Sequence, residues 1–338
     1  MMPPDNAQLP APDALSVEAD PESAPPYGLS NDVDASIEPE VEGVPEESRA
    51  KNAVEPSPSY AIGEPGRSGW LVGAEPTDPS RPDCSLDAID FLWGSVRAAS
   101  TRGRSHRFGN TVRQDSYAIR SCPNGTVAIA VADGVSSGPQ SDVAARIATR
   151  RATTLIVDEE FDVASRDMWK EVIVDVRERI LVEGARRSDS SEVQSVAAIM
   201  STTLVCTATT KVNEGLAVHV LALGDTSAWI LRDRTWRSLT AVKNLGVEIA
   251  SSSVAALPAR TEFELFEEIL LPGDAFFVMS DGVGDPLGNG EGEVADRLAE
   301  WWSAPPSIHE FGAQVDFARK TFDDDRTVVG VWVKAGSG

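Results

Sequence analysis

The order of strand-like and helix-like segments constrains the fold of this chain more than any other feature. Apolar segments typical of strands come in runs, and amphipathic segments typical of helices follow them in pairs, without strict alternation. Such blocks favour an α+β fold with antiparallel sheets over a doubly wound parallel sheet. The expected strands are 91–98, 115–121, 127–132, 202–210, 216–223, 227–232, the end of the 230s, 263–271, 275–280 and 327–334, and the expected helices are 141–158, 162–187, 293–302 and 307–321.

The first 85 residues differ in composition from the rest. They carry 17 Asp and Glu against 4 Lys and Arg, so they hold more than half of the chain's net charge of −23. Such a Pro-rich acidic segment cannot bury enough apolar surface to offset its ordering entropy. We expect residues 1–85 to be a disordered tail and residues 86–338 to form one domain. The tail could be a tether, a phosphorylatable segment, an acidic docking arm or a solvated extension without a partner.

Charge and hydrophobicity exclude several classes of partner. A strongly acidic chain repels nucleic acid phosphates and anionic membrane surfaces, so neither is an expected partner. No apolar run approaches the roughly 20 residues that a membrane helix needs, and the N-terminus does not resemble a secretory leader. The cysteines, Cys84, Cys122 and Cys206, are scattered without metal-ligand spacing, which is typical of reduced thiols. We expect a soluble, cytoplasmic protein.

The apolar segment 127–132 ends abruptly at Asp133-Gly134. Six small or β-branched residues without a charge predict a strand buried on both faces. A backbone that turns at Gly134 can aim its carbonyl in the same direction as the Asp133 carboxylate, so two oxygens can converge on one cation. A plain Asp-Gly turn between two strands is the alternative.

Three more acids, Asp115, Asp281 and Asp324, lie at or beside the end of a predicted strand. Hard divalent cations such as Mg²⁺ and Mn²⁺ take oxygen ligands, so a sheet that brings these ends together would form a metal site. Taken singly, Asp281-Gly282 is equally typical of a turn, and residues 323–325 of a solvated acidic loop.

Six short motifs follow one another along roughly residues 90–334 of the chain. They are Gln114-Asp115-Ser116, Val131-Ala132-Asp133-Gly134, Ser201-Thr202-Thr203-Leu204, Leu223-Gly224-Asp225-Thr226, Ser280-Asp281-Gly282-Val283-Gly284-Asp285 and Asp324-Asp325-Arg326-Thr327-Val328-Val329. This ordered set resembles the metal-dependent, type 2C serine/threonine protein phosphatases. The segment Gly103-Arg104-Ser105-His106 is similar to a bacterial branch of that family.

The resemblance implies a four-layer α-β-β-α sandwich, with two antiparallel sheets flanked by helices and two Mn²⁺ or Mg²⁺ ions at one end. By position in the motifs, Asp133 would bridge the two ions and the Gly134 carbonyl would bind one of them. Asp281 and Asp324 would hold the other ion. Asp324 is preferred to its acidic neighbours because Thr327 then falls at the third position after it.

Two further acids acquire roles from the same resemblance. Asp115 would orient metal-bound water or bind a metal directly, and Asp225 would help to hold a third, weaker metal ion. The implied reaction is hydrolysis of phosphoserine or phosphothreonine by a hydroxide that bridges the two ions, without a phosphoenzyme. The implied partners are phosphorylated proteins and a serine/threonine kinase whose action the phosphatase opposes.

The chain also departs from the family pattern around these acids. Gln114 replaces a common Glu, and Asn110 stands where the family has a phosphate-binding Arg. His106 and Arg113 are candidates to replace that Arg, and each could equally be an ordinary surface or strand residue. These departures favour the alternative of a catalytically weak or inactive pseudophosphatase that acts as a binding module, whereas the retained acids favour an enzyme.

Overall fold

A computed structural model of the chain describes residues 60–65, 78, 80–213, 215–240 and 255–334. All of them belong to the larger of the two units into which the chain divides, Val54–Gly338. Among these residues, no helix combines the length and the apolar character that crossing a membrane requires.

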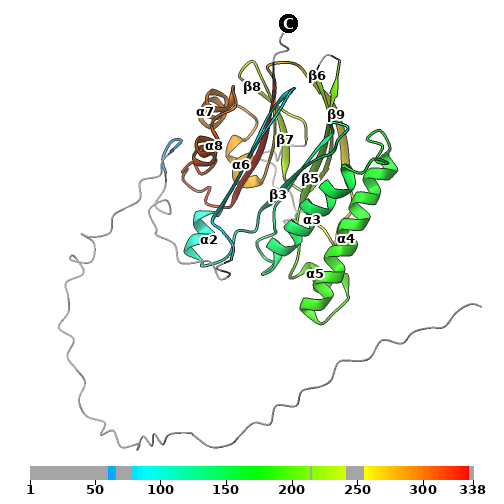
Figure 1. The fold of residues 1–338 in the computed structure, drawn as a ribbon. Coiled ribbons are helices and arrows are strands. Elements are labelled where there is room, and N and C mark those ends of the chain that lie inside the picture. The colour runs from blue at the N-terminus through cyan, green and yellow to red at the C-terminus, as the bar shows by residue number, and fades with distance from the viewer. Residues whose placement is uncertain (1–59, 66–77, 79, 214, 241–254, 335–338) are drawn as a thin grey trace, which may run out of the picture. The chain divides into compact units, whose positions relative to one another are not determined.

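Two antiparallel sheets stack face to face in the described part of the chain (Figure 1). The six-stranded sheet has the order β1-β2-β11-β10-β7-β8 and comprises β1 (Cys84–Phe91), β2 (Gly94–Thr101), β11 (Arg326–Val333), β10 (Ala275–Met279), β7 (Ser227–Arg232) and β8 (Thr235–Ser238). The five-stranded sheet has the order β3-β4-β5-β6-β9 and comprises β3 (Ser116–Ser121), β4 (Val127–Ala132), β5 (Leu204–Val212), β6 (Gly215–Leu223) and β9 (Glu264–Leu270).

Residue alternation along β4 divides the core into layers. Val127, Ile129 and Val131 join the cluster between the two sheets, whereas Ala128 and Ala130 join the cluster beneath the helices. Successive side chains of a strand point to opposite faces, so a strand covered on both sides must be apolar throughout. The prediction of a strand buried on both faces is confirmed, because all six residues of β4 are buried.

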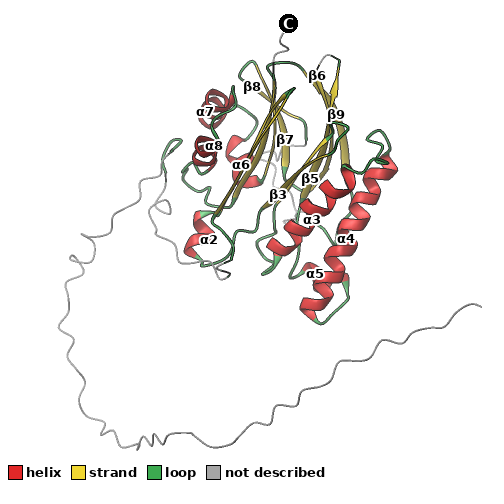
Figure 2. Ribbon diagram, in the orientation of Figure 1, coloured by secondary structure: helices red, strands yellow, loops and turns green. Residues whose placement is uncertain are grey.

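Helices cover the outer face of each sheet (Figure 2). Over the five-stranded sheet lie α3 (Ser141–Ile156) and α4 (Arg166–Ser188), and α5 (Val193–Ala197) packs against α4. With the six-stranded sheet pack α6 (Asp281–Leu287), α7 (Glu293–Trp302) and α8 (Ile308–Val315). Alanines of α3 face the sheet and allow close approach, while Trp169 of α4 fills the space beside them. The predicted α+β fold and its α-β-β-α layers are therefore confirmed.

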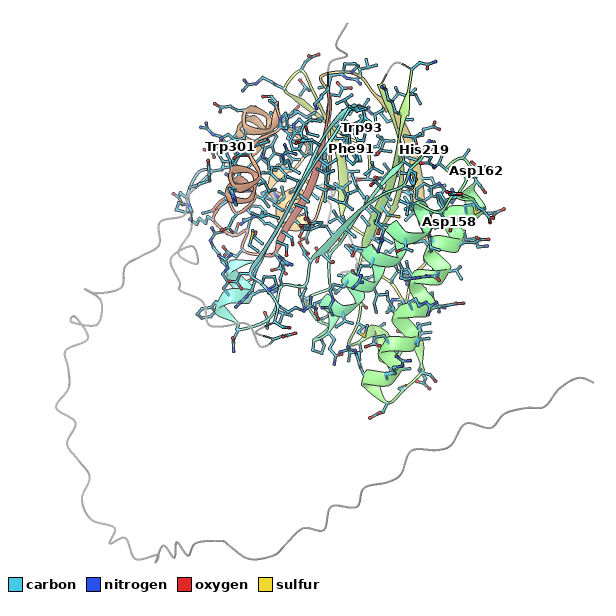
Figure 3. The ribbon with its side chains drawn as sticks, in the orientation of Figure 1. Phe91, Trp93, Asp158, Asp162, His219 and Trp301 are labelled. Atoms are coloured by element: carbon cyan, nitrogen blue, oxygen red, sulfur yellow. The ribbon has the colours of Figure 1, made fainter. Side chains whose placement is uncertain are left out.

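The predicted strand 91–98 is confirmed over residues 94–98 but begins too early, because a hairpin turn interrupts it. Phe91 ends β1 and pairs with Gly94, the first residue of β2, so Leu92 and Trp93 form the turn. Leu92 is fully exposed, and the rings of Phe91 and Trp93 stack with centroids 4.8 Å apart (Figure 3). Apolar residues that typify a strand interior here pack on each other at a hairpin tip.

Three short helices were not predicted from the sequence. One predicted helix is shorter than expected. The unpredicted helices are α2 (Arg104–Phe108), α5 and α6, each too short to show a helical period. Asp281-Gly282 consequently begins a helix rather than a turn. The helix expected over 307–321 ends at Val315, where α8 stops.

Residues 60–65 lie within the predicted tail, yet they pack against the domain. The Ile62 N–H donates to the Ala318 carbonyl at 3.1 Å, and the Ile62 side chain is buried. The Tyr60 ring contacts Trp301, labelled in Figure 3, with centroids 5.0 Å apart. A short apolar segment thus docks where only a disordered tail was expected. The rest of the predicted tail up to residue 77 lies outside the described residues.

Candidate functional site

Strand pairing brings the four predicted strand-end acids to one edge of the stacked sheets. β3 and β4 pair antiparallel, so Asp115 before β3 lies beside Asp133 after β4. β10 and β11 pair in the same way, so Asp281 after β10 adjoins Asp324 before β11. The two strand pairs belong to different sheets, and the sheets stack, so the acids meet between them. The charges of Asp115, Asp281 and Asp324 all act on the Asp133 carboxyl.

Neighbouring threonines fix the backbone at Asp133. Its N–H donates to the Thr203 Oγ1 at 3.0 Å, and its carbonyl accepts from the Thr203 N–H at 2.9 Å. The Thr202 hydroxyl donates to the same carbonyl at 2.8 Å. The Thr203 hydroxyl in turn lies 2.6 Å from the Thr226 hydroxyl. The motif with Thr202 and Thr203 therefore holds the main chain of Asp133, and the Thr226 hydroxyl supports Thr203.

Gly134 is required by close packing. A Cβ at this position would lie 2.9 Å from the Gln114 carbonyl oxygen and 2.9 Å from the carbonyl carbon of Ser141. Any larger residue would push the strand end away from α3. The sequence pattern explained Gly134 by a turn, whereas the structure shows contact from two sides. Metal binding by the Gly134 carbonyl stays a prediction.

The carboxyls of Asp115 and Asp133 are held close to other acids. Burial raises the pKa of Asp115 to about 8, and the charge of Asp325 acts in the same direction. Burial likewise raises the pKa of Asp133 well above its ordinary value, followed by the charges of Asp115 and Asp281. Carboxylates buried together resist ionisation unless a cation joins them.

Asp281 sits at the first turn of α6 and contacts Asp133. Burial raises the pKa of Asp281 to about 6, against a hydrogen bond with Asp133 that lowers it. The charges of Asp225 and Asp324 raise it further. The structure thus brings Asp225, predicted only from the resemblance, close enough to act on Asp281.

Asp115 has one oxygen satisfied and one without a partner. Its Oδ2 accepts a hydrogen bond from the Ser280 Oγ at 2.7 Å. Its Oδ1 is buried and has no hydrogen-bond partner among the described residues, and the same holds for the Oε1 of Gln114. The Nε2 of Gln114 donates to the Gly138 carbonyl at 3.1 Å, which leaves its Oε1 on the other side of the amide. Two buried oxygens without donors fit a site for a hard cation.

Asp325 is a buried acid, although the motif spacing predicted its neighbour Asp324 as the ligand. One carboxylate oxygen accepts from the Gly103 N–H at 2.6 Å, and the other accepts from the Gln114 N–H at 2.5 Å. The Asp115 N–H lies 3.4 Å from that second oxygen. Asp325 therefore ties the start of α2 and the start of β3 to the start of β11. The run of three aspartates was the available signal, but it does not say which of them turns inward.

His106 in α2 lies against two of these acids. Its Nδ1 is 2.9 Å from the Asp325 Oδ1, and its Nε2 is 3.6 Å from the Asp324 Oδ1. Burial lowers the pKa of His106, but the hydrogen bond and charge of Asp325, with the charge of Asp324, outweigh it and raise the pKa above the ordinary value. Among the described residues, His106, Asp324 and Asp325 form a group whose ligand atoms could hold one metal ion.

Arg113 and Asn110, in contrast, are not brought to the acids. The Arg113 guanidinium donates to the Ser100 carbonyl of β2 at 2.7 Å and to the Ser85 Oγ of β1 at 3.0 Å. This position favours the alternative of an ordinary strand residue. Asn110 is exposed just after α2, with φ of 56°, a conformation that Asn tolerates.

A cleft of about 370 Å³ opens beside the acids. The described residues that line it are Ser105, Asp281, Gly282, Asp285, Thr321, Phe322, Asp323 and Asp324, and none of them is basic. A phosphate group entering this cleft would therefore meet carboxylates, unless cations stood between them. The nearby Arg326 is buried, donates to the Gly282 carbonyl at 3.1 Å and stacks on Phe317. These contacts stabilise the fold and do not place its guanidinium in the lining of the cleft.

Sequence comparison identifies the family to which these features belong. The family of protein phosphatase 2C matches residues 102–309, well over half of the chain. The chain belongs to the protein phosphatase 2C family. The resemblance drawn from the six motifs is thus confirmed, and by family the chain is a phosphoprotein phosphatase, a hydrolase. No curated protein matches the chain in sequence.

Solved structures support the fold at low sequence identity. The serine/threonine phosphatase Stp1 from Staphylococcus aureus is 14% identical with a TM-score of 0.53, covering 74% of this chain and 100% of its own. A serine/threonine phosphatase from S. agalactiae is 16% identical with a TM-score of 0.50, at the same coverages of 74% and 100%. A bacterial serine phosphatase is 13% identical with a TM-score of 0.53, covering 72% of this chain and 99% of its own.

Proposed function

We propose that this chain hydrolyses phosphoserine and phosphothreonine in proteins, using two divalent cations held between the sheet ends. The observation that carries the proposal is the convergence of Asp115, Asp133, Asp281 and Asp324, whose charges act on one another in a partly buried place. Structural acids are normally paired with donors or cations, so an acid cluster of this kind is typical of a metal site.

The donor set suits Mn²⁺ or Mg²⁺. The carboxylates and the Gly134 carbonyl offer oxygen, the donor these ions prefer, and the Oδ1 of Asp115 is buried without a hydrogen-bond partner among the described residues. Asp133 and the Gly134 carbonyl would hold one ion, with Asp133 shared by the second. Asp281 and Asp324 would complete the second position. Asp225, whose charge acts on Asp281, would help to hold a third, weaker ion.

Two such ions would supply hydroxide at neutral pH by lowering the pKa of a bridging water, and would offset the charge of the transferred phosphoryl group. The protein's own contribution is positioning. The threonines fix the main chain of Asp133, Ser280 holds the Asp115 carboxyl, and His106 lies beside the Asp324 carboxylate. We treat His106 as a residue that positions Asp324. Phosphorylated proteins are the proposed substrates, and the serine/threonine kinase that they imply stays a prediction.

The test is hydrolysis of a phenyl phosphate ester and of phosphothreonine peptides, with Mn²⁺ and with EDTA. We expect Mn²⁺-dependent turnover that the isosteric variant Asp133→Asn lowers by on the order of 100- to 1,000-fold in kcat, since one charged ligand is lost. The control is Asp233→Asn in the exposed turn between β7 and β8, which should leave turnover unchanged. Equal turnover by Asp133→Asn and the wild type would overturn the proposed site.

A second candidate function follows from the cleft without basic residues and from the neutral Gln114. These features favour a pseudophosphatase that binds a partner without turnover. Absence of turnover with Mn²⁺ and Mg²⁺, on both the ester and the peptides, would support this candidate against the enzyme.

A further inference from the structure

The helices α3 and α4 lie side by side on the outer face of the five-stranded sheet (Figure 1). Residues of both helices, arginines above all, line a groove between them. Its volume is about 520 Å³. The lining residues are Val143, Arg146, Ile147, Arg150 and Arg151 of α3 and Arg179, Val182, Glu183, Arg186 and Arg187 of α4. Six arginines and one glutamate line the groove, and Asp142 and Asp175 lie beside it as ion-pair partners, so the surface keeps an excess of positive charge on a chain with a net charge of −23.

The protein itself neutralises only part of this charge. Arg151 makes two hydrogen bonds of 2.8 Å to Asp175, and Arg187 lies 2.7 Å from Glu183. Arg179 lies 3.9 Å from Asp175 and Arg146 lies 3.8 Å from Asp142. Arg150 is exposed and forms no ion pair with the described part of the chain. The Arg186 side chain is 73% exposed. It lies 3.7 Å from Glu183, farther than Arg187, which binds the same glutamate at 2.7 Å. At least two guanidinium groups are therefore available to an acidic ligand.

The surface between the arginines is apolar. Val143, Ile147 and Val182 line the same groove, and Val182 is 52% exposed although it is large and apolar. A mixture of apolar and cationic groups suits a peptide that carries both acidic and apolar side chains. A nucleic acid would be repelled by the rest of the acidic chain, so charge complementarity favours a protein ligand.

The groove begins beside the proposed metal site. Ser141, the first residue of α3, packs against Gly134, and the Arg187 Nη1 donates to the Gln140 Oε1 at 3.0 Å at that end of the helix. From there Arg150 lies about 14 Å along α3 at about 1.5 Å per residue. An extended peptide covers that length in roughly four residues, so the arginines lie within reach of residues flanking a phosphorylated one.

We infer that this arginine groove binds acidic residues of the phosphoprotein substrate and makes the enzyme select acidic phosphorylation sites. The inference rests on the proposed function, because the bound segment is a part of the substrate. Acidic residues separated from the phosphorylated residue by on the order of three to six positions would reach the guanidinium groups of Arg150 and Arg186.

The experiment uses the full chain and two phosphothreonine peptides. One carries glutamates about three to six residues to either side of the phosphothreonine, and the other carries glutamines there. The groove variant is Arg150→Gln with Arg186→Gln. The matched control is Arg234→Gln with Arg297→Gln, two exposed arginines outside the groove that give the same change in net charge.

We expect the wild type to prefer the glutamate peptide through a lower KM. The groove variant should lose about three- to tenfold in affinity for it with kcat unchanged, because exposed ion pairs are individually weak. Its turnover of the glutamine peptide and of the phenyl phosphate ester should stay unchanged. The preference should also weaken as salt rises, since screening acts on exposed charges.

Binding of the unphosphorylated glutamate peptide, followed by fluorescence anisotropy, separates this inference from the proposed function. If turnover is missing but the groove variant binds this peptide more weakly than the control does, the phosphatase proposal fails and the groove stands. Equal KM values for the two peptides, or equal behaviour of the groove and control variants, would overturn the groove. Preferential displacement of the peptide by a single-stranded oligonucleotide, or by a peptide of the chain's own acidic residues 31–48, would also overturn the assignment to a substrate.

Discussion

Asp325 and Asp133 are carboxylates at the same edge of the sheets, but their surroundings are opposite. Asp325 is buried, accepts hydrogen bonds from the backbone N–H groups of Gly103, Gln114 and Asp115, and pairs with His106. The Asp133 carboxyl faces the acids Asp115 and Asp281, and burial with those charges raises its pKa well above the ordinary value.

The difference separates a structural acid from a ligand. A buried carboxylate that backbone donors satisfy stabilises the fold by joining the segments that donate to it. A carboxylate that meets other carboxylates instead destabilises the protein until a cation arrives. Proximity to the cleft does not distinguish the two roles, whereas the presence of donors does.

The largest expected effect on stability comes from Asp325→Ala. This change leaves the N–H groups of Gly103 and Gln114 buried without an acceptor and removes the ion-pair partner of His106. We expect a loss of roughly 3–5 kcal/mol in the free energy of unfolding, as for breaking other buried charged pairs. The measurement is urea unfolding in EDTA, so that no metal contributes.

Asp324→Ala is the matched control. The Asp324 side chain is 46% exposed, so its loss should cost less than about 1 kcal/mol in the free energy of unfolding. If Asp324→Ala proves as costly as Asp325→Ala, the division into structural acid and ligand is wrong.

Asp281→Asn should raise the stability of the metal-free protein, because it removes one of the negative charges that repel one another in the acid cluster.

Metal binding is the next largest effect. The pKa of Asp115 is raised to about 8 and that of Asp281 to about 6, from an ordinary 3.8. A raised pKa means that the folded chain binds more protons than the unfolded chain between those values. Stability of the metal-free protein should therefore fall as the pH rises from about 4 to about 8. Mn²⁺ should reverse this loss, by about 2.7 kcal/mol at a concentration 100 times its Kd.

Differential scanning calorimetry at pH 5 and pH 8 measures the metal effect. We expect a larger Mn²⁺-induced rise in Tm at pH 8, where protons no longer compete for the carboxylates. Asp133→Asn should reduce the rise at both values, and Asp233→Asn should leave it unchanged. An equal rise in the wild type and in Asp133→Asn would place the metal elsewhere.

Much of the fold could be predicted because long periodic segments report burial directly. The strand β4 and the helices α3, α4 and α7 were predicted to within a few residues, since each buries a continuous apolar face. The hairpin at Leu92 and the helix α6 were not, because a turn made of apolar residues and a helix containing Pro286 show no such period.

The candidate site was predictable in part: the sequence indicated the acids at strand ends but not the contacts made by Asp325. Acids that follow apolar strands are visible in the sequence, and antiparallel pairing then brings them together, as for Asp115 and Asp133. The role of Asp325 was not visible, because it depends on donors from Gly103 and Gln114, more than 200 positions earlier in the chain. The arginine groove likewise arises only when α3 and α4 lie side by side.

The smallest expected effect tests the residue that touches both kinds of acid. The Gln114 N–H donates to Asp325, while its side chain lies with Nε2 on the Gly138 carbonyl and Oε1 buried without a partner. Gln114→Glu replaces the donor to Gly138 with an acceptor and adds a charge beside Asp115. We expect the metal-free protein to lose about 1–2 kcal/mol in the free energy of unfolding, the cost of one buried unsatisfied group.

With Mn²⁺ bound, Gln114→Glu should be more stable than the wild type. The added carboxylate attracts the cation by its charge, whereas the amide is neutral. The Kd for Mn²⁺, measured by titration calorimetry, should fall in Gln114→Glu relative to the wild type. Gln140→Glu is the matched control: its Oε1 already accepts from Arg187 at the start of α3, where a negative charge is favourable, so stability and Kd should hardly change. If Gln114→Glu weakens Mn²⁺ binding, the free oxygen of Gln114 does not face the metal, and residue 114 belongs with Asp325 on the structural side of the comparison.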